Sequence, residues 1–367
     1  MNSLLGATSE ADEHNPDTVL EMTADQVLKP PMRQVQHALS TAQNDVAHTR
    51  FEALLAAIPD VHERRECQTR HLSQSGIGAM HFALCLPSTD EALTMQDHLL
   101  RESCRRCLGI ERVTTPGSLC PACPKENTPQ HARRCARTGL LTARHNLVCR
   151  TVASGLRQMG LTGVRSEDYA PFVVGPRTGL HIDLTIPGGQ GLTLSRGADA
   201  ATVAAKNIMI DVSMVDPTAD RLLPRAHCEQ GYAAELRSRE KHVHYNPTVF
   251  AAAQYTLVPI ALETFGSMCK EGHKFWDSVA TYKVHQSGGT WHKSAVLEWW
   301  RKRLSIAVQS AVSFAVDASL SRSRPQGDAG AYTRLHLLRP VAQASCATST
   351  PAQAGTDTRV GAMPPCT

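Results

Sequence analysis

The 367-residue chain is 42% hydrophobic and 20% charged, a composition typical of soluble globular protein with one large or two ordinary domains. Its longest apolar run, near residues 249–262, is about fourteen residues long and is interrupted by Gln254. A membrane span needs roughly twenty apolar residues, and a secretory signal needs a basic start where this chain carries Glu10 and Asp12. We therefore expect an intracellular protein.

Cysteine and basic residues are concentrated in one part of the chain. Residues 101–150 hold ten Lys or Arg and three Glu, a local charge of +7 within a total of +4. Short cysteine spacings in a reducing compartment favour metal binding over disulfides, and a basic segment around such a site points to phosphate. Six of the twelve cysteines lie in this segment: Cys104, Cys107, Cys120, Cys123, Cys135 and Cys149.

The first part of the chain predicts helices. Residues 1–60 are polar and weakly periodic, which indicates a loosely ordered segment with one or two helices near 33–57. Apolar residues at helical spacing over 72–108 predict two short helices around a break at Pro87. A further amphipathic helix is expected from Leu141 to Gly160.

Beyond that helix the apolar period changes from helical to alternating. GLHIDLTI and NIMIDVSMVD both read as strands, with Asp183 and Asp211 on their less apolar faces. A helix is expected after Gly231, then a strand in YTLVPIALETFG with Pro259 at an edge or entry. A long helix over 294–318 follows, and the Ser/Pro/Gly-rich remainder predicts a flexible tail.

These elements predict an α/β fold with six segments. They are a loosely ordered N-terminal segment (1–60), a helical segment (61–115), a cysteine-rich segment (116–138), a core that contains the alternating strands (139–266), a helical extension (267–321) and a tail (322–367).

The sixteen residues CPACPKENTPQHARRC have the spacing C-x2-C-x7-H-x3-C. Zinc prefers four such ligands in a tetrahedron, and a C-x2-C turn brings two thiolates to one ion. We therefore predict a structural zinc site formed by Cys120, Cys123, His131 and Cys135. Cys104 and Cys107 have the same short spacing but no evident return pair; they could join Cys149 or His145, although unligated cysteines on a helix fit better.

The order of motifs resembles the C-terminal part of non-LTR (LINE-type) retrotransposon polyproteins. The matching pieces are HARRC, ARHNLV, HIDLTI, MIDVSMVDP, EKHVHY and ALETFG, and the resemblance covers about two thirds of the chain. Such proteins join a CCHC knuckle to a restriction-like endonuclease of the PD-(D/E)XK superfamily. The resemblance thus implies a mixed sheet flanked by helices that presents carboxylates to Mg²⁺.

Site residues follow from this resemblance by position. Asp183 and Asp211 would bind Mg²⁺, Lys241 would supply the catalytic cation, and Tyr245 would lie one turn later on the same helix face. Glu167 is a candidate for an additional acid. DNA, and possibly element RNA, would be the partner, in the nucleus. The residues expected to contact nucleic acid are Arg133, Arg134, Arg137, Arg144 and His145.

Two other interpretations stay open. His181 and Ile182 replace the basic residue and proline of the family, and Ser213 stands where the commoner arrangement has lysine, which suits a catalytically dead nucleic-acid-binding scaffold. A third interpretation is a zinc-stabilised interaction protein without a nucleic-acid role. No reverse-transcriptase Y/F-x-D-D signature is present in the sequence.

Overall fold

The computed structural model describes residues 32–85, 90–110, 112–169, 181–192, 194, 207–245 and 255–323. Its α-helices are α2 (Met32–Ala57), α3 (Val61–Gln74), α4 (Asp97–Leu108), α5 (Pro129–Arg134), α6 (Leu140–Gln158), α8 (Leu223–Ala226), α9 (Tyr232–Tyr245), α11 (Lys270–Gln286) and α12 (Lys293–Leu320). Short 3-10 helices occupy His81–Leu84, Glu91–Leu93, Ala136–Thr138 and Gly189–Gly191.

The strands β1 (Arg165–Asp168), β2 (Ile182–Ile186), β3 (Asn207–Val215) and β4 (Tyr255–Glu263) form one mixed sheet in the order β1-β2-β3-β4. The first two pairings are antiparallel, whereas β3 and β4 are parallel and joined through α9. Pro259, which cannot donate a ladder hydrogen bond, lies within edge strand β4, as expected from its chemistry. The predicted α/β class with a mixed sheet flanked by helices is therefore observed.

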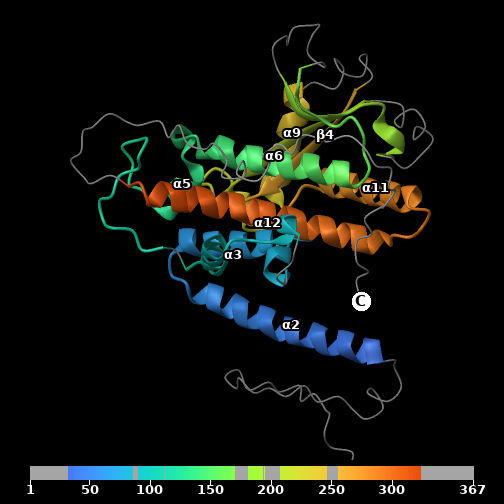
Figure 1. The fold of residues 1–367 in the computed structure, drawn as a ribbon. Helices are drawn as coiled ribbons and strands as arrows, with labels where there is room; N and C mark the ends of the chain where they lie inside the picture. The colour runs from blue at the N-terminus through green and yellow to red at the C-terminus, as the bar shows by residue number, and fades with distance from the viewer. Residues whose placement is uncertain are drawn as a thin grey trace, which may run out of the picture.

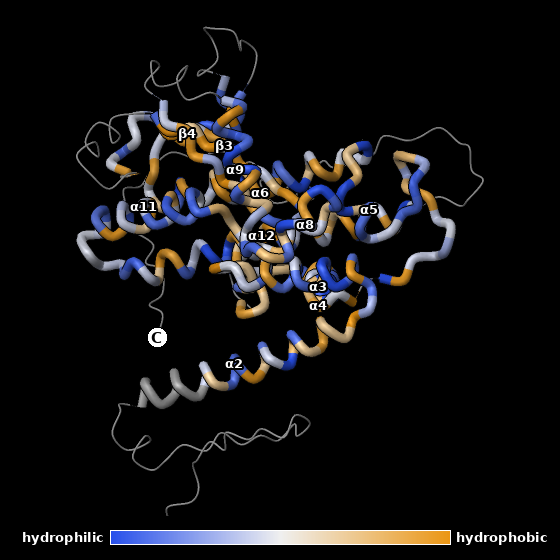
Figure 2. The backbone as a smooth tube through the Cα atoms, turned by 180° about the vertical axis from the view of Figure 1, so that it is seen from behind, coloured by the Kyte–Doolittle hydropathy of each residue, from blue (hydrophilic) through white to orange (hydrophobic). Residues whose placement is uncertain are grey.

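Helices cover both faces of the sheet (Figure 1). One face packs on α6, α11 and α12, where a single apolar cluster joins Leu184, Ile210 and Ile260 to Leu156 and Trp300. On the other face α9 contacts β3 and β4. Figure 2 shows β3 and β4 as largely hydrophobic, consistent with strands buried on both faces.

The regular alternation expected for β2 fails at one position. Leu184 and Ile186 belong to the main cluster, but Ile182 packs with Met209 and Tyr245 in a separate cluster. Strict alternation predicts that Ile182 shares a face with Leu184 and Ile186, and this prediction is wrong. Asp183, the next residue, points toward α6, so the strand departs from regular pleating where the candidate carboxylate lies.

α12 lies at the centre of the helical layer and contacts α4, α5, α6 and α11 (Figure 1). Its residues are buried over most of its 28-residue length, because a helix that is apolar around much of its circumference needs neighbours on several sides. The predicted helices at 141–160, after Gly231 and at 294–318 correspond to α6, α9 and α12. Only one helix, α2, forms near residues 33–57, and Pro87 and the predicted tail from 324 onward lie outside the described residues.

No helix in the described part of the chain combines the length and apolar character needed to cross a membrane.

Candidate functional site

The predicted knuckle brings its four ligand atoms together. The Cys120 Sγ lies 3.7 Å from the Cys135 Sγ, which is 3.9 Å from the Cys123 Sγ, and the Cys123 Sγ is 3.1 Å from the His131 Nε2. Zn–S bonds of about 2.3 Å would place two thiolates of a tetrahedron about 3.8 Å apart. This cluster could hold one metal ion such as zinc.

Local hydrogen bonds explain how so short a segment forms the cluster. The Cys120 N–H donates to the Lys125 carbonyl at 2.8 Å, and Leu119 forms an antiparallel bridge with Glu126. The Thr128 hydroxyl then accepts from the His131 N–H and caps α5, so that His131 and the following cysteine return toward the turn. Burial raises the pKa of the Cys120 thiol to about 12, which a bound cation would reverse because it stabilises the thiolate.

The segment around the cluster is anchored to the end of β3 by a buried ion pair. Asp216, directly after β3, accepts from Arg134 Nε at 2.9 Å and lies 3.4 Å from Arg133 Nε. Burial opposes ionisation of Asp216, but the two guanidinium groups and hydrogen bonds from Arg134 and Thr218 outweigh it and lower its pKa. We did not predict the structural role of Asp216 from the sequence. The signal that could have indicated it is an acidic residue at the end of a buried strand.

Two arginines expected to contact nucleic acid are inside the protein. Arg133 is 4% exposed and Arg144 is 6% exposed. Arg144 donates to the Arg133 carbonyl at 3.1 Å, and burial lowers the pKa of Arg144 to about 10. The prediction of phosphate contacts is corrected for these two, because their guanidinium groups bind partners inside the protein, Asp216 for Arg133 and the Arg133 carbonyl for Arg144. Arg134 is partly exposed and Arg137 is exposed.

The two aspartates predicted to form the acidic site lie side by side in the sheet. Leu184 pairs with Ile210 in antiparallel register. The next residues of the two strands, Asp183 and Asp211, therefore lie opposite each other. Asp183 Oδ2 accepts from the Val212 N–H at 2.7 Å. A side-chain carboxylate therefore replaces a backbone partner where β2 departs from β3.

Helix α9 supplies the predicted lysine and tyrosine to the same place. Lys241 Nζ donates to Asp211 Oδ2 at 2.8 Å, and the Tyr245 hydroxyl donates to the same oxygen at 2.7 Å. The two side chains are four residues apart and share a helix face. Asp211 is 3% exposed, and its other oxygen, Oδ1, is buried with no hydrogen-bond partner among the described residues.

His145 approaches Asp183 from α6. Its Nε2 lies 3.1 Å from Asp183 Oδ1 and 3.4 Å from the Cys149 Sγ, one helical turn further on. The hydrogen bond with Asp183 raises the pKa of His145, against the effect of burial. Burial and the charges of Asp183, Asp211 and Glu167 raise the pKa of Cys149.

Glu167 lies on β1 at the level of this cluster. Its neighbours pair as Ser166 with Leu184 and Asp168 with Ile182, which sets Glu167 opposite Asp183. It is exposed and has a φ of 52°, in the left-handed region that is uncommon for a residue with a side chain. The register thus brings a third carboxylate to the edge of the acidic site.

Two further groups of residues have structural roles outside the acidic site. The Oε1 of Glu263 accepts from the Ala233 and Ala234 N–H groups at the start of α9 and so caps this helix. Cys104 and Cys107 lie on a helix, α4, as predicted, and pack in an apolar cluster with Phe82. Neither belongs to a metal-competent group in the described part of the chain.

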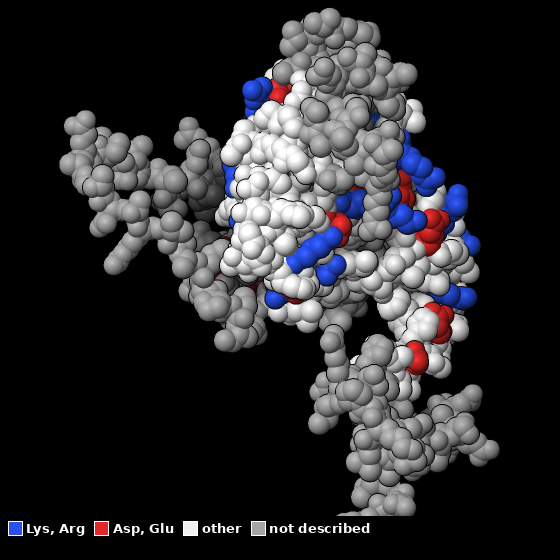
Figure 3. Space-filling model, turned by 90° about the vertical axis from the view of Figure 1, so that its right-hand side faces the viewer, with Lys and Arg blue, Asp and Glu red and all other residues white. Residues whose placement is uncertain are grey.

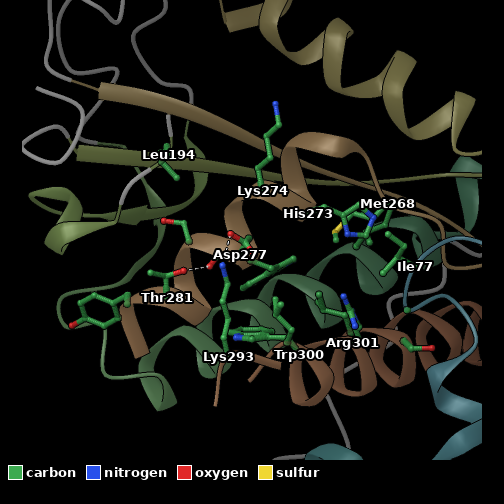
Figure 4. Close-up of a pocket in the computed structure, with 18 of the residues that line it drawn as sticks. Ile77, Leu194, Met268, His273, Lys274, Asp277, Thr281, Lys293, Trp300 and Arg301 are labelled. Carbon is green, nitrogen blue, oxygen red and sulfur yellow. Dashed lines mark hydrogen bonds and ion pairs between the residues drawn. The ribbon is translucent and has the colours of Figure 1, made fainter. Parts of the chain in front are cut away.

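A cavity of about 1300 Å³ lies apart from the acidic site, between α11 and α12 (Figure 4). Trp300 and Arg301 line it, and its Asp277 and Lys293 pair at 2.7 Å. Asp183 and Asp211 are not among its described lining residues, so the cavity plays no part in the acidic constellation. On the face shown in Figure 3, basic and acidic side chains lie near one another over the described residues.

Neither a protein-family model nor a curated protein matches this sequence. The class of protein that the fold and site define is thus a mixed α/β protein with a metal-competent Cys₃His cluster and a separate acidic constellation.

Proposed function

We propose that this chain is a Mg²⁺-dependent, restriction-like endonuclease that nicks DNA, joined to a zinc knuckle, and that it is a fragment of a non-LTR retrotransposon acting in the nucleus. One observation carries this: a buried Asp211 carboxylate has Lys241 and Tyr245 on one oxygen and, within the described part of the chain, no hydrogen-bond partner on the other. A buried carboxylate oxygen without a donor is costly unless a cation satisfies it.

The residues present fit Mg²⁺. Asp183 and Asp211 offer hard carboxylate oxygens from adjacent strands, the ligand type that Mg²⁺ prefers. When bound there, Mg²⁺ would neutralise phosphate charge and lower the pKa of a ligated water. Asp183 holds its orientation through the Val212 N–H, and Asp211 is held by Lys241 and Tyr245.

The protein side chains then divide the work of hydrolysis. A water molecule would attack phosphorus through its oxygen and give up a proton, the bond to the leaving sugar oxygen would break, and that sugar oxygen would gain a proton. Lys241 places a positive charge at the edge of the site, where charge develops on the phosphate oxygens. His145, hydrogen-bonded to Asp183, can hold or release a proton at Nε2.

The test is nicking of supercoiled plasmid by the purified full chain with Mg²⁺ or Mn²⁺. Asp211→Asn should lower the nicking rate by on the order of a hundredfold or more, because the variant loses a charged ligand in a buried site. Asp220→Asn is the matched control, since the Asp220 side chain is 84% exposed and forms its ion pairs with His62 and Arg134. Equal nicking by parent and Asp211→Asn would contradict the proposal.

A second candidate is a nucleic-acid-binding protein that does not cleave. Ser213 stands on β3 two residues after Asp211, and its buried hydroxyl has no hydrogen-bond partner among the described residues, where the family pattern has a lysine. Salt-sensitive retention of plasmid or element RNA without nicking would favour this candidate. Undetectable binding to nucleic acid would exclude both.

A further inference from the structure

The acidic site contains a second set of metal ligands that differs in chemistry from a Mg²⁺ site. His145 and Cys149 are four residues apart on α6 and so face the same way, and both meet Asp183 from β2. Their three ligand atoms all lie within 4.8 Å of one another. Imidazole and thiolate are ligands that select zinc-like ions, whereas Mg²⁺ takes oxygen.

The distances suit one tetrahedral ion. With Zn–N, Zn–O and Zn–S bonds near 2.0–2.3 Å, tetrahedral edges are about 3.4 Å for nitrogen to oxygen and about 3.6 Å for nitrogen to sulfur. The His145 Nε2 lies 3.1 Å from Asp183 Oδ1 and 3.4 Å from the Cys149 Sγ. Shifts of a few tenths of an ångström would bring these two distances to the tetrahedral values, and the third, from Asp183 to the Cys149 Sγ, is at most 4.8 Å.

The surroundings favour a cation and leave it a route of entry. His145 is 32% exposed and Asp183 is 15% exposed, so the group is half-buried and not sealed. Asp211 and Glu167 add negative charge near Cys149, and Lys241 adds an opposing positive charge near His145. Three protein ligands would leave a fourth position for water, as in open zinc sites.

We infer that His145, Cys149 and Asp183 form a second, weaker site for Zn²⁺ or a similar thiophilic divalent cation, which takes Asp183 away from Mg²⁺ and so inhibits nicking. The inhibitory part rests on the proposed endonuclease function, because it concerns the same carboxylate. The binding part rests on the geometry of α6 and β2 alone. The four-ligand knuckle should fill first and the three-ligand site second.

The first experiment counts metal ions and does not depend on nicking. The full chain, stripped and then equilibrated in zinc-buffered solutions, is analysed for bound zinc, and Co²⁺ titration follows thiolate-to-metal absorption. The parent should bind two equivalents with separate affinities, and Cys149→Ser should lose the second. Cys67→Ser is the control, because Cys67 is a half-buried cysteine on α3 outside both metal-competent groups of the described residues.

Loss of the first equivalent together with the second would indicate misfolding, so the same titration is made on His145→Gln, which should also retain one equivalent. One equivalent in the parent, or two in both variants, would overturn the inference.

The second experiment measures nicking at constant Mg²⁺ with increasing free Zn²⁺, above the level that fills the knuckle. Each protein is compared with itself without added zinc. The parent should be inhibited, and Cys149→Ser should need about tenfold more zinc for the same fractional inhibition.

The outcomes separate the two ideas. Nicking with one bound zinc leaves the proposed function standing and overturns the second site. Two bound zinc ions without nicking establish the site and remove its inhibitory role together with the endonuclease. Equal zinc sensitivity of parent and Cys149→Ser overturns the inhibitory role even if the parent nicks.

Discussion

The knuckle and the acidic site are both built from metal-type ligands, but they are assembled in different ways. The knuckle takes all four ligands from residues 120–135, and one turn and one short helix suffice to bring them together. The acidic site takes its members from α6, β2, β3 and α9, over residues 145–245. The first depends on local hydrogen bonds and the second on the register of a sheet.

β3 connects the two. Asp211 lies within this strand, and Asp216, just beyond its end, pairs with the arginines that follow His131. The knuckle segment is therefore tied to the strand that carries a candidate catalytic carboxylate, so damage to one region can be tested for its effect on the other.

The largest expected effect comes from removing metal from the knuckle. Binding of a structural zinc ion is worth on the order of 10 kcal/mol, and a segment this short has no core of its own. Chelation should lower Tm and make Cys120, Cys123 and Cys135 reactive toward alkylation, while far-UV circular dichroism of the sheet and α12 is largely kept. Thiol alkylation that is equally slow before and after chelation would show that no metal holds the segment.

The next effect concerns the connection at the end of β3. Asp216→Asn should reduce the free energy of unfolding by about 3–5 kcal/mol, because it removes a buried negative charge that pairs with the buried Arg133 guanidinium. Denaturant unfolding measures the loss, and Asp220→Asn, at an exposed site, should stay within about 0.5 kcal/mol of the parent.

The same pair has a defined pH dependence. The pKa of Asp216 is lower in the folded than in the unfolded chain, so its contribution is complete above the ordinary aspartate value and is lost as pH falls toward the folded value. The stability difference between parent and Asp216→Asn should therefore shrink below about pH 4. A difference that stays constant down to pH 3 would argue against the ion pair.

A smaller effect is expected where α6 meets α12. A Cβ on Gly155 would overlap the ring of the buried Trp300. Gly155→Ala should therefore destabilise the protein by about 1–3 kcal/mol through overpacking, even though alanine favours a helix by about 1 kcal/mol. Urea unfolding of Gly155→Ala in a Trp300→Phe background should show a smaller added loss; an equal loss would place the strain elsewhere.

The smallest effect is the coupling of His145 to Asp183. Because the pKa of His145 is raised in the folded state, its stabilising contribution is complete below its ordinary value of 6.5 and disappears as pH rises through the raised value. The parent should exceed His145→Gln in stability by under about 1 kcal/mol at pH 6 and lose that advantage by about pH 9. A pH-independent difference would indicate packing instead of charge.

Much of this arrangement could be predicted from particular residues. The spacing of Cys120, Cys123, His131 and Cys135 predicted a cluster that the structure assembles. The four-residue interval between Lys241 and Tyr245 placed both on one helix face, and both reach Asp211. The basic character around the knuckle was misleading for Arg133 and Arg144, since charge counts do not reveal which guanidinium groups are buried.

Spacing and periodicity, which act over a few residues, were enough to indicate the knuckle, the main helices and the alternating strands, because turns and helix faces depend on local geometry. Tertiary packing determines three other features. They are the break in pleating at Ile182, the link from Asp216 to α5, and the approach of His145 and Cys149 to Asp183. Those contacts join groups far apart along the chain, and their positions depend on how α6 and the sheet fit together, which no local pattern encodes.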